Sequence, residues 1–248
     1  MTRTARFLPG KTLPDALGAA MKRINAYGVI YPDGYHQVLV EKYSHGGVRY
    51  PHILMIIGEP RIHRHFFYPH VIGKAGRLLD YGCGTADNVR QLIRDGFPRE
   101  QITAFDINRE SIDLGIDLYR DREQMEDLFV VSEKFPFGIE EFDIVYSASV
   151  IHVIADETEF NNYLANAHSA LRPGGVLFGS TLGLVDGVVR SPGNRGPPRL
   201  MTKKQLADSL AGTEFSRPDI VTRGGVPEYV PHHENICVFE FYTKKQTL

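Results

Sequence analysis

The residues best suited to chemistry are two glycines and two aspartates that follow a short apolar run, residues 77–81. Gly82 and Gly84 stand where that run ends, with Asp80 before them and Asp87 after them. When a strand turns into a helix through such glycines, the backbone can approach a ligand closely, and free N–H groups of the helix face that ligand. The segment therefore predicts a binding loop for a nucleotide-like ligand.

Asp87 narrows the class of ligand. A dinucleotide-binding loop has a third glycine at this point, because the pyrophosphate sits against the helix N-terminus, and a carboxylate would repel it. The same carboxylate would attract an ammonium group, which favours a ligand that carries an amino acid and no phosphate. An equally good explanation is that Asp87 is simply an acid that stabilises the first helical turn.

Asp106 is the second acid of interest. It ends the next apolar run, residues 102–106, and comes shortly before Asn108, a typical helix N-cap. A carboxylate at the end of a second strand can accept hydrogen bonds from both hydroxyls of a ribose, or it can stabilise its own turn. Taken together, the glycine loop and Asp106 favour a ligand that contains ribose.

The elements that position these residues are predicted by alternating patterns. From Arg77 onward, short apolar runs alternate with segments of helical periodicity, which is typical of a parallel sheet covered by helices. Thr202 and Gln205 form a capping box for a later helix that ends before Gly212. The expected strands are residues 77–81, 102–106, 128–131, 142–147, 176–181 and 236–242, and the expected helices among them are residues 87–95, 111–119 and 156–171.

Residues 1–76 do not share this alternation. Apolar residues at helical spacing predict a helix over residues 13–24, and a second helix is expected over residues 37–43. Because this part has no strands of its own, we predict an N-terminal helical cap on an α/β core of residues 77–248. Residues 183–201 are rich in Gly, Pro and Arg, which favours a lid loop, or else a solvated excursion, after the fifth core strand.

Several core segments resemble the class I S-adenosylmethionine-dependent methyltransferases, in particular the branch that modifies small molecules. Residues 80–85 look like that family's first motif, Asp106 matches its ribose-binding acid, and residues 142–147 and 171–177 look like its fourth-strand and fifth-strand motifs. The resemblance spans about residues 77–182. It implies a Rossmann-like, seven-stranded, mostly parallel sheet with a reversed last strand, S-adenosylmethionine as cofactor and S-adenosylhomocysteine as product.

The resemblance also implies which residues bind the cofactor. Family members often carry an acidic residue that touches adenine after the third strand, whereas this chain offers Ser132 and Glu133 in a shortened loop, and both stay candidates. The expected cofactor-binding residues are Asp80, Gly82, Cys83, Gly84, Asp87, Asp106, Ile107, Ser132, Glu133 and Ser147.

Candidates for catalysis and substrate binding lie outside these motifs. Methylation of a hydroxyl is helped by a general base, and a neutral histidine suits that role at cellular pH. His152, shortly after the fourth strand, is the candidate base, with local packing as the alternative. Tyr35 and His36 in the cap, and Arg190 in the lid loop, are candidates for substrate contact, and packing or exposure to solvent is the alternative for each.

Composition restricts the partners. With 28 Lys and Arg against 30 Asp and Glu in 248 residues, the formal net charge of -2 gives no basic field for a nucleic acid. No apolar run approaches the roughly 20 residues needed to cross a bilayer, and we recognise no export signal, so we expect a cytoplasmic protein without membrane contact. The two cysteines and the histidines of residues 36–70 show no ligand spacing, so no metal is expected.

The leading hypothesis is a methyltransferase that acts on a small organic molecule, with oxygen preferred as the acceptor atom. An enzyme that methylates nucleic acid or protein is disfavoured by the charge and by residues 147–150, which lack the family motif for methylating amino groups of bases or glutamine. A nicotinamide-dependent oxidoreductase is disfavoured by Asp87. The alternative is a protein that binds the same cofactor as a fixed charge or regulatory ligand without transferring a methyl group. A homodimer formed through the cap is a further possibility.

Overall fold

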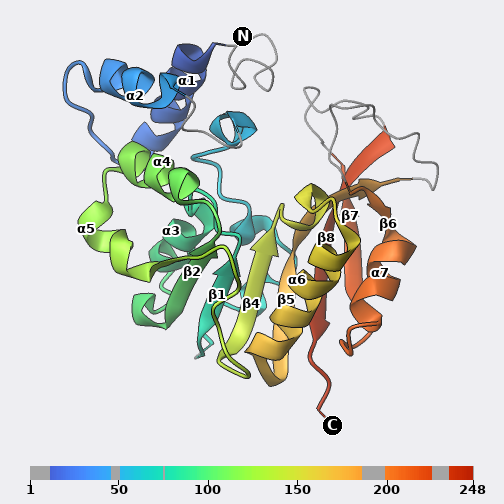
Figure 1. Ribbon diagram of the computed structural model, residues 1–248. Coiled ribbons are helices and arrows are strands. Elements are labelled where there is room, and N and C mark those ends of the chain that lie inside the picture. The colour runs from blue at the N-terminus through green and yellow to red at the C-terminus, as the bar shows by residue number, and fades with distance from the viewer. Residues whose placement is uncertain (1–11, 46–50, 75, 186–198, 225–234, 248) are drawn as a thin grey trace.

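The computed structural model describes residues 12–45, 51–74, 76–185, 199–224 and 235–247. Its centre is a sheet with the strand order β3-β2-β1-β4-β5-β8-β7, which carries helices on both faces (Figure 1). The strands are β1 Leu78–Tyr81, β2 Ile102–Asp106, β3 Phe129–Val131, β4 Phe142–Ala148, β5 Leu171–Leu184, β6 Met201–Thr202, β7 Asp219–Arg223 and β8 Ile236–Lys244.

Strand β8 is reversed relative to its neighbours. It pairs antiparallel with β5 and β7, whereas the pairs from β3 through β5 are parallel. The predicted mostly parallel sheet with a reversed last strand is therefore confirmed. Apolar runs did not predict β7, because only Ile220 among its five residues is buried, or β6, which is two residues long and pairs with β5.

The helices begin at capping residues that the sequence identifies. Asn108 accepts the N–H of Ser111 at 2.8 Å ahead of α4, and Thr202 forms the predicted capping box with Gln205 ahead of α7. The helices are α1 Leu13–Asn25, α2 Tyr35–Ser44, α3 Asp87–Arg94, α4 Arg109–Tyr119, α5 Arg122–Met125, α6 Glu157–Ala170 and α7 Lys203–Ala211.

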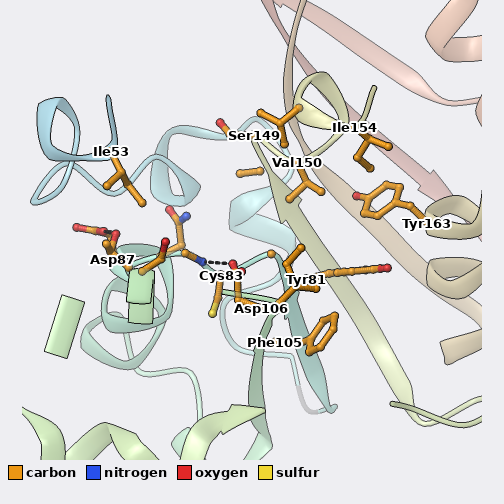
Figure 2. A pocket seen from close by; sticks show the side chains of 18 of the residues that line it. Ile53, Tyr81, Cys83, Asp87, Phe105, Asp106, Ser149, Val150, Ile154 and Tyr163 are labelled. Carbon is orange, nitrogen blue, oxygen red and sulfur yellow. Dashed lines mark hydrogen bonds between the residues drawn. The ribbon is translucent and has the colours of Figure 1, made fainter. Parts of the chain in front are cut away.

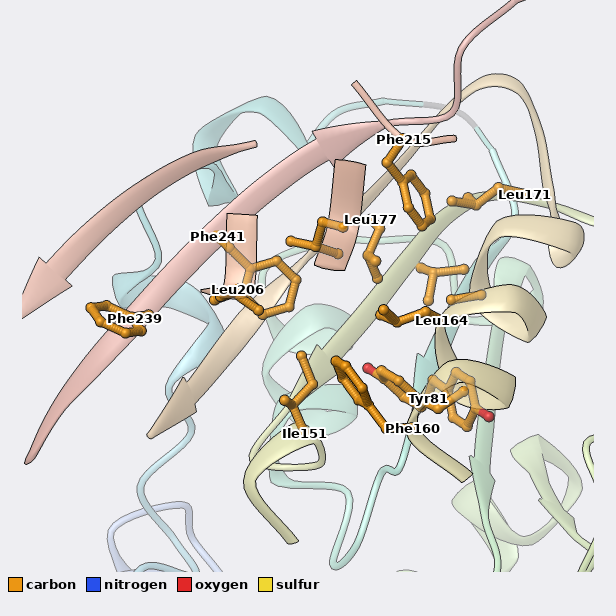
Figure 3. Packing of buried hydrophobic residues seen from close by; sticks show 14 of the residues in the cluster. Tyr81, Ile151, Phe160, Leu164, Leu171, Leu177, Leu206, Phe215, Phe239 and Phe241 are labelled. Atoms are coloured by element: carbon orange, nitrogen blue, oxygen red, sulfur yellow. The ribbon is translucent and has the colours of Figure 1, made fainter. Parts of the chain in front are cut away.

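The two faces of the sheet have separate hydrophobic cores. On one face α6 and α7 pack against the sheet, where Leu164 and Leu206 meet Leu177 and Phe241 (Figure 3). On the other face α3, α4 and residues 62–71 cover the strands. Each large apolar side chain buried in this way stabilises the fold by about 1.5–3 kcal/mol, which holds the carboxyl ends of β1, β2 and β4 in fixed positions.

The described residues before the core divide into three parts. Helices α1 and α2 pack on α4 rather than on the sheet, in a cluster that includes Leu17, Leu39 and Leu114. Residues 62–71 instead lie on the sheet, where Nε2 of His65 is 2.9 Å from the carbonyl oxygen of Gly179. The segment between them, residues 53–61, passes over the carboxyl ends of the parallel strands, so it supplies a wall of the site described below.

None of the helices in the described ranges combines the length and the apolar character that a membrane-crossing segment needs.

Candidate active site

The glycine loop is pressed between two neighbouring segments. The N–H groups of Gly82 and Cys83 both donate to the carbonyl oxygen of Phe105 in β2, at 2.8 and 3.0 Å. Gly82 has φ +83°, and a Cβ atom added there would overlap Cγ2 of Val150, which follows β4. Gly84 has φ +56°, another left-handed conformation that other residues adopt rarely. The loop therefore requires glycine for its conformation and, at Gly82, for space.

Asp106 holds the other side of the loop. Its Oδ2 accepts the N–H of Gly84 at 2.8 Å (Figure 2). Its Oδ1 accepts the N–H of Asn108 at 2.8 Å. The structure thus brings together the loop and the second acid that sequence spacing links. Because β1 and β2 are parallel neighbours, both features stand at the same edge of the sheet.

Asp80 is a buried carboxyl group beneath the loop. It is 1% exposed, and its Oδ2 has no hydrogen-bond partner among the described residues. Burial, together with the smaller effect of the nearby carboxylates of Asp106 and Asp87, raises the pKa of Asp80 to about 8. Asp80 is therefore largely protonated at neutral pH, and a cationic group bound close by would favour its ionised form.

Asp87 has a structural role that the sequence did not reveal. Its Oδ1 accepts the N–H of Gly58 and the hydroxyl of Tyr119, both at 2.6 Å, and its Oδ2 accepts the hydroxyl of Thr85. The carboxylate therefore ties the glycine loop to the end of α4 and to the segment over the strands. It also lines the cavity, so contact with a ligand ammonium group stays a prediction.

A cavity of about 750 Å³ opens at this edge of the sheet (Figure 2). Its walls are the glycine loop, the end of β2, the turn after β4, one side of α6 and the segment of residues 53–61. The predicted cofactor-binding residues that line it are Gly82, Cys83, Gly84, Asp87, Asp106, Ile107 and Glu133. The other predicted residues, Asp80, Ser132 and Ser147, are not among the described lining residues.

These three residues lie close to the site without lining it. The hydroxyl of Ser147 donates to the carbonyl oxygen of Tyr81 at 2.7 Å, which fixes β4 to β1. The hydroxyl of Ser132 accepts the N–H of Lys134 at 3.3 Å, while the neighbouring Glu133 lines the cavity. Of the two candidates for adenine contact, Glu133 is therefore the one with access to a ligand.

The predicted catalytic and substrate residues are not found at the described cavity wall. Nδ1 of His152 accepts the N–H of Leu182 at 3.2 Å, and the ring is 7% exposed. Tyr35 donates to the carbonyl oxygen of Asp117, and His36 lies against Pro14. These contacts favour the packing alternative for all three side chains, although their roles stay predictions. Arg190 and most of the predicted lid loop lie outside the described residues.

Other lining residues were missed by sequence reasoning. Arg61, before the core, donates from Nη2 to the hydroxyl of Ser149 at 2.7 Å. Asn162, Tyr163 and Asn166 come from α6, in which Tyr163 is one of the buried residues and the two asparagines are not. The polar positions 162 and 166 share one helix face at a spacing of four, which is a weak signal. No pattern around Arg61 indicates that its segment folds back over the strands.

Among the described residues, no group of three or more His, Cys, Asp or Glu side chains could hold a metal ion. The polar groups of the cavity are instead aspartates, glutamates, asparagines, hydroxyls and two cations, mixed with apolar residues such as Ile53, Ile56 and Ile154. Such a lining suits an organic ligand with a few polar groups.

Comparison with known proteins finds relatives of the core. A family model described as a methyltransferase domain matches residues 78–175. The methyltransferase adrK of Penicillium rubens is 33% identical over 102 residues, which cover 37% of this chain and 37% of that protein. The O-methyltransferase atr3 of Stereocaulon alpinum is 33% identical over 103 residues, covering 37% of this chain and 30% of that protein. The chain thus spans about a third of the length of these curated relatives.

Solved structures resemble this chain in fold although their sequences differ widely from it. The phosphoethanolamine N-methyltransferase 2 of Haemonchus contortus, in complex with phosphomonomethylethanolamine and S-adenosylhomocysteine, superposes with a TM-score of 0.62 at 14% sequence identity. The superposition covers 89% of this chain and 61% of that one. At such low identity the likeness concerns the fold alone.

Proposed function

The chain belongs to the class I S-adenosylmethionine-dependent methyltransferases, and from this premise we propose that it methylates a small organic molecule, with oxygen as the preferred acceptor atom. The observation that carries the proposal is the pairing of Asp106 with Gly84 at the mouth of the cavity. This contact brings Asp106, for which we propose a sugar-binding role, beside a loop whose glycines leave room for a ligand.

The residues present fit S-adenosylmethionine. Glycines at positions 82 and 84 leave a cradle that side chains would fill, and the carboxylates of Asp87 and Asp106, which line the cavity, suit an ammonium group and ribose hydroxyls, respectively. The unpartnered Oδ2 of Asp80 is a buried acceptor that a cation would satisfy. When bound, the cofactor supplies a methyl group on a positively charged sulfur.

The protein's own contribution is alignment and exclusion of water. Transfer of a methyl group breaks its bond to sulfur and forms a bond to the acceptor, so the two reactants must meet in line. Ser149, Val150 and Ile154 follow β4 and border the cavity beside the glycine loop, which is where an acceptor would meet the cofactor. Apolar side chains there would keep water away and favour an apolar acceptor.

The preference for oxygen is supported by two of the relatives, which are named O-methyltransferases: atr3, described above, and phiE of a fungal species, 26% identical over 149 residues. The near-neutral charge supports a small molecule rather than a polyanion. Both points concern the acceptor class and leave its identity open to experiment.

Calorimetry with S-adenosylmethionine and S-adenosylhomocysteine, followed by incubation with methyl-labelled cofactor and candidate acceptors, tests the proposal. We expect both nucleosides to bind and the label to appear on an oxygen of the product. The variant Asp106→Ala should bind S-adenosylhomocysteine about ten- to a hundredfold more weakly, because hydrogen bonds to a charged group are worth about 1.5–3 kcal/mol. A product without label would instead support the alternative in which the cofactor acts as a fixed charge.

A further inference from the structure

Arg61 is a cation in the cavity wall for which no ion pair is found in the described part of the chain. Among the described residues that line the cavity, only Arg61 and Lys134 are cationic. Other partly buried arginines of the described chain form ion pairs: Arg90 lies 2.7 Å from Asp121, and Arg199 lies 2.8 Å from Glu157. For Arg61 the one side-chain bond found is to the hydroxyl of Ser149 at 2.7 Å, so its charge has no carboxylate partner within the described ranges.

Hydrogen bonds hold Arg61 at its backbone and at its guanidinium. Oδ1 of Asn88, in the first turn of α3, accepts the N–H groups of Arg61 and Ile62 at 3.0 and 3.1 Å. At the other end, Ser149 has φ +63°, and its N–H donates to the carbonyl oxygen of Ser180 at 2.8 Å. Ser149 is thus held in a rarely populated backbone conformation with its hydroxyl bound to the guanidinium of Arg61. These contacts indicate that the Arg61 side chain has a defined position, unlike a mobile arginine at the surface.

Three acids of the cavity wall already have donors. Glu59 lies 3.7 Å from Arg23, Asp87 accepts three hydrogen bonds, and Asp106 accepts the N–H groups of Gly84 and Asn108. They are therefore poor candidates to neutralise Arg61. A guanidinium offers a planar fork of donors that matches a carboxylate, so the missing partner is best supplied by a ligand.

We propose that Arg61 binds a carboxylate of a ligand in the cavity, between the start of α3 and the turn after β4. The proposal rests on the function proposed above and deepens it. Two ligands of that function can carry the carboxylate. One is the cofactor, whose amino acid end has a carboxylate as well as the ammonium group that the acids of the site would bind. The other is a methyl acceptor that is itself an acid. Since no histidine lines the described cavity, an acceptor that is already ionised at neutral pH would need no base.

Whether the carboxylate that Arg61 binds belongs to the cofactor is tested with S-adenosylmethionine and decarboxylated S-adenosylmethionine, which differ only in that carboxylate. Calorimetry on the wild-type protein should show a preference for the first, and Arg61→Gln should lower that preference about ten- to a hundredfold, while Arg61→Lys keeps part of it. Arg64→Gln is the matched control, because Arg64 follows three residues later in the chain, is exposed and is not among the described residues that line the cavity. Thermal unfolding of each variant verifies that it is folded.

The acceptor source is tested in the presence of S-adenosylhomocysteine with a panel of small aromatic and aliphatic carboxylic acids and their primary amides. If the carboxylate belongs to the acceptor, Arg61→Gln keeps the cofactor preference but loses the preference for acids over amides. The proposal is overturned if the variant keeps the cofactor preference and binds no acid of the panel more weakly than the wild-type protein does. Should the wild-type protein bind neither nucleoside, the proposed function fails instead.

Discussion

The hydroxyl of Tyr119, the last residue of α4, donates to Oδ1 of Asp87 at 2.6 Å, and the same oxygen accepts the N–H of Gly58 at 2.6 Å. One carboxylate thus connects the glycine loop, α4 and the segment that forms a wall of the cavity. Burial, and then the charge of Asp87, raises the pKa of Tyr119, so that its hydroxyl stays protonated as a donor. The arrangement makes the ligand loop depend on the residues before the core.

Tyr119→Phe tests this dependence. Loss of the hydroxyl should lower the free energy of unfolding by about 1–2 kcal/mol and also weaken binding of S-adenosylhomocysteine, because Asp87 then holds the loop less firmly. Urea unfolding and calorimetry measure the two effects. The control is Tyr31→Phe, since Tyr31 donates to the carbonyl oxygen of Leu118, away from the loop, at 2.6 Å. Equal losses of affinity in both variants would contradict a specific role for Tyr119.

A second prediction concerns Gly115 in the middle of α4. A Cβ atom there would overlap the carbonyl oxygen of Thr85, and that oxygen cannot easily move because Nη1 of Arg90 donates to it at 2.5 Å. Gly115→Ala should therefore destabilise the protein by about 1–3 kcal/mol and displace the glycine loop, which weakens nucleoside binding. Urea unfolding and calorimetry check both effects.

Gly18→Ala in α1 is the matched control for Gly115→Ala. A Cβ atom at Gly18 would meet only the ring of His36, at 3.6 Å, which is ordinary contact. The control should be neutral or stabilise the protein by up to about 1 kcal/mol, because alanine favours helices over glycine. If Gly115→Ala behaves in the same way, the close packing of α4 on the loop is not what positions it.

The sequence predicted the parts of the site that depend on local pattern. Gly82, Gly84 and Asp106 stand at the ends of apolar runs, and parallel strands bring such ends to one edge, so their proximity follows from order and spacing. Arg61 reaches the cavity because its segment folds back over the strands, and Tyr163 reaches it because one face of α6 packs there. Both placements depend on tertiary packing, which no residue spacing in the sequence indicates. The hydrogen bonds that Asp87 accepts from Gly58 and Tyr119 were missed for the same reason, because these two residues are distant from it in sequence.

The pH dependence of the protein should reflect Asp80. Burial raises its folded pKa to about 8, above its usual value of 3.8, so the folded state binds more protons than the unfolded state between these values. The free energy of unfolding should therefore fall as pH rises from about 4 to 8, and Asp80→Asn should remove that contribution. Urea unfolding across this range checks the slope. An unchanged slope in the variant would show that Asp80 titrates normally.

Nucleoside affinity should depend on pH in the opposite sense. A ligand ammonium group near Asp80 favours the ionised carboxylate, so binding below pH 8 releases a proton and becomes tighter as pH rises toward that value. Calorimetry in buffers of different ionisation enthalpy counts the released proton. In Asp80→Asn no such release should remain, and a persistent release would assign the proton to another group.

The last prediction separates the two interpretations of His152. Its Nδ1 accepts the N–H of Leu182 at 3.2 Å, which an asparagine side chain can also do, since its Oδ1 stands near the place of Nδ1. His152→Asn therefore keeps the hydrogen bond and removes the basic nitrogen. Because His152 lies outside the described cavity wall, we expect the variant to retain most of the wild-type kcat and the wild-type pH profile. A fall of kcat by about 100- to 10,000-fold, with loss of the basic limb of that profile, would instead support His152 as the general base.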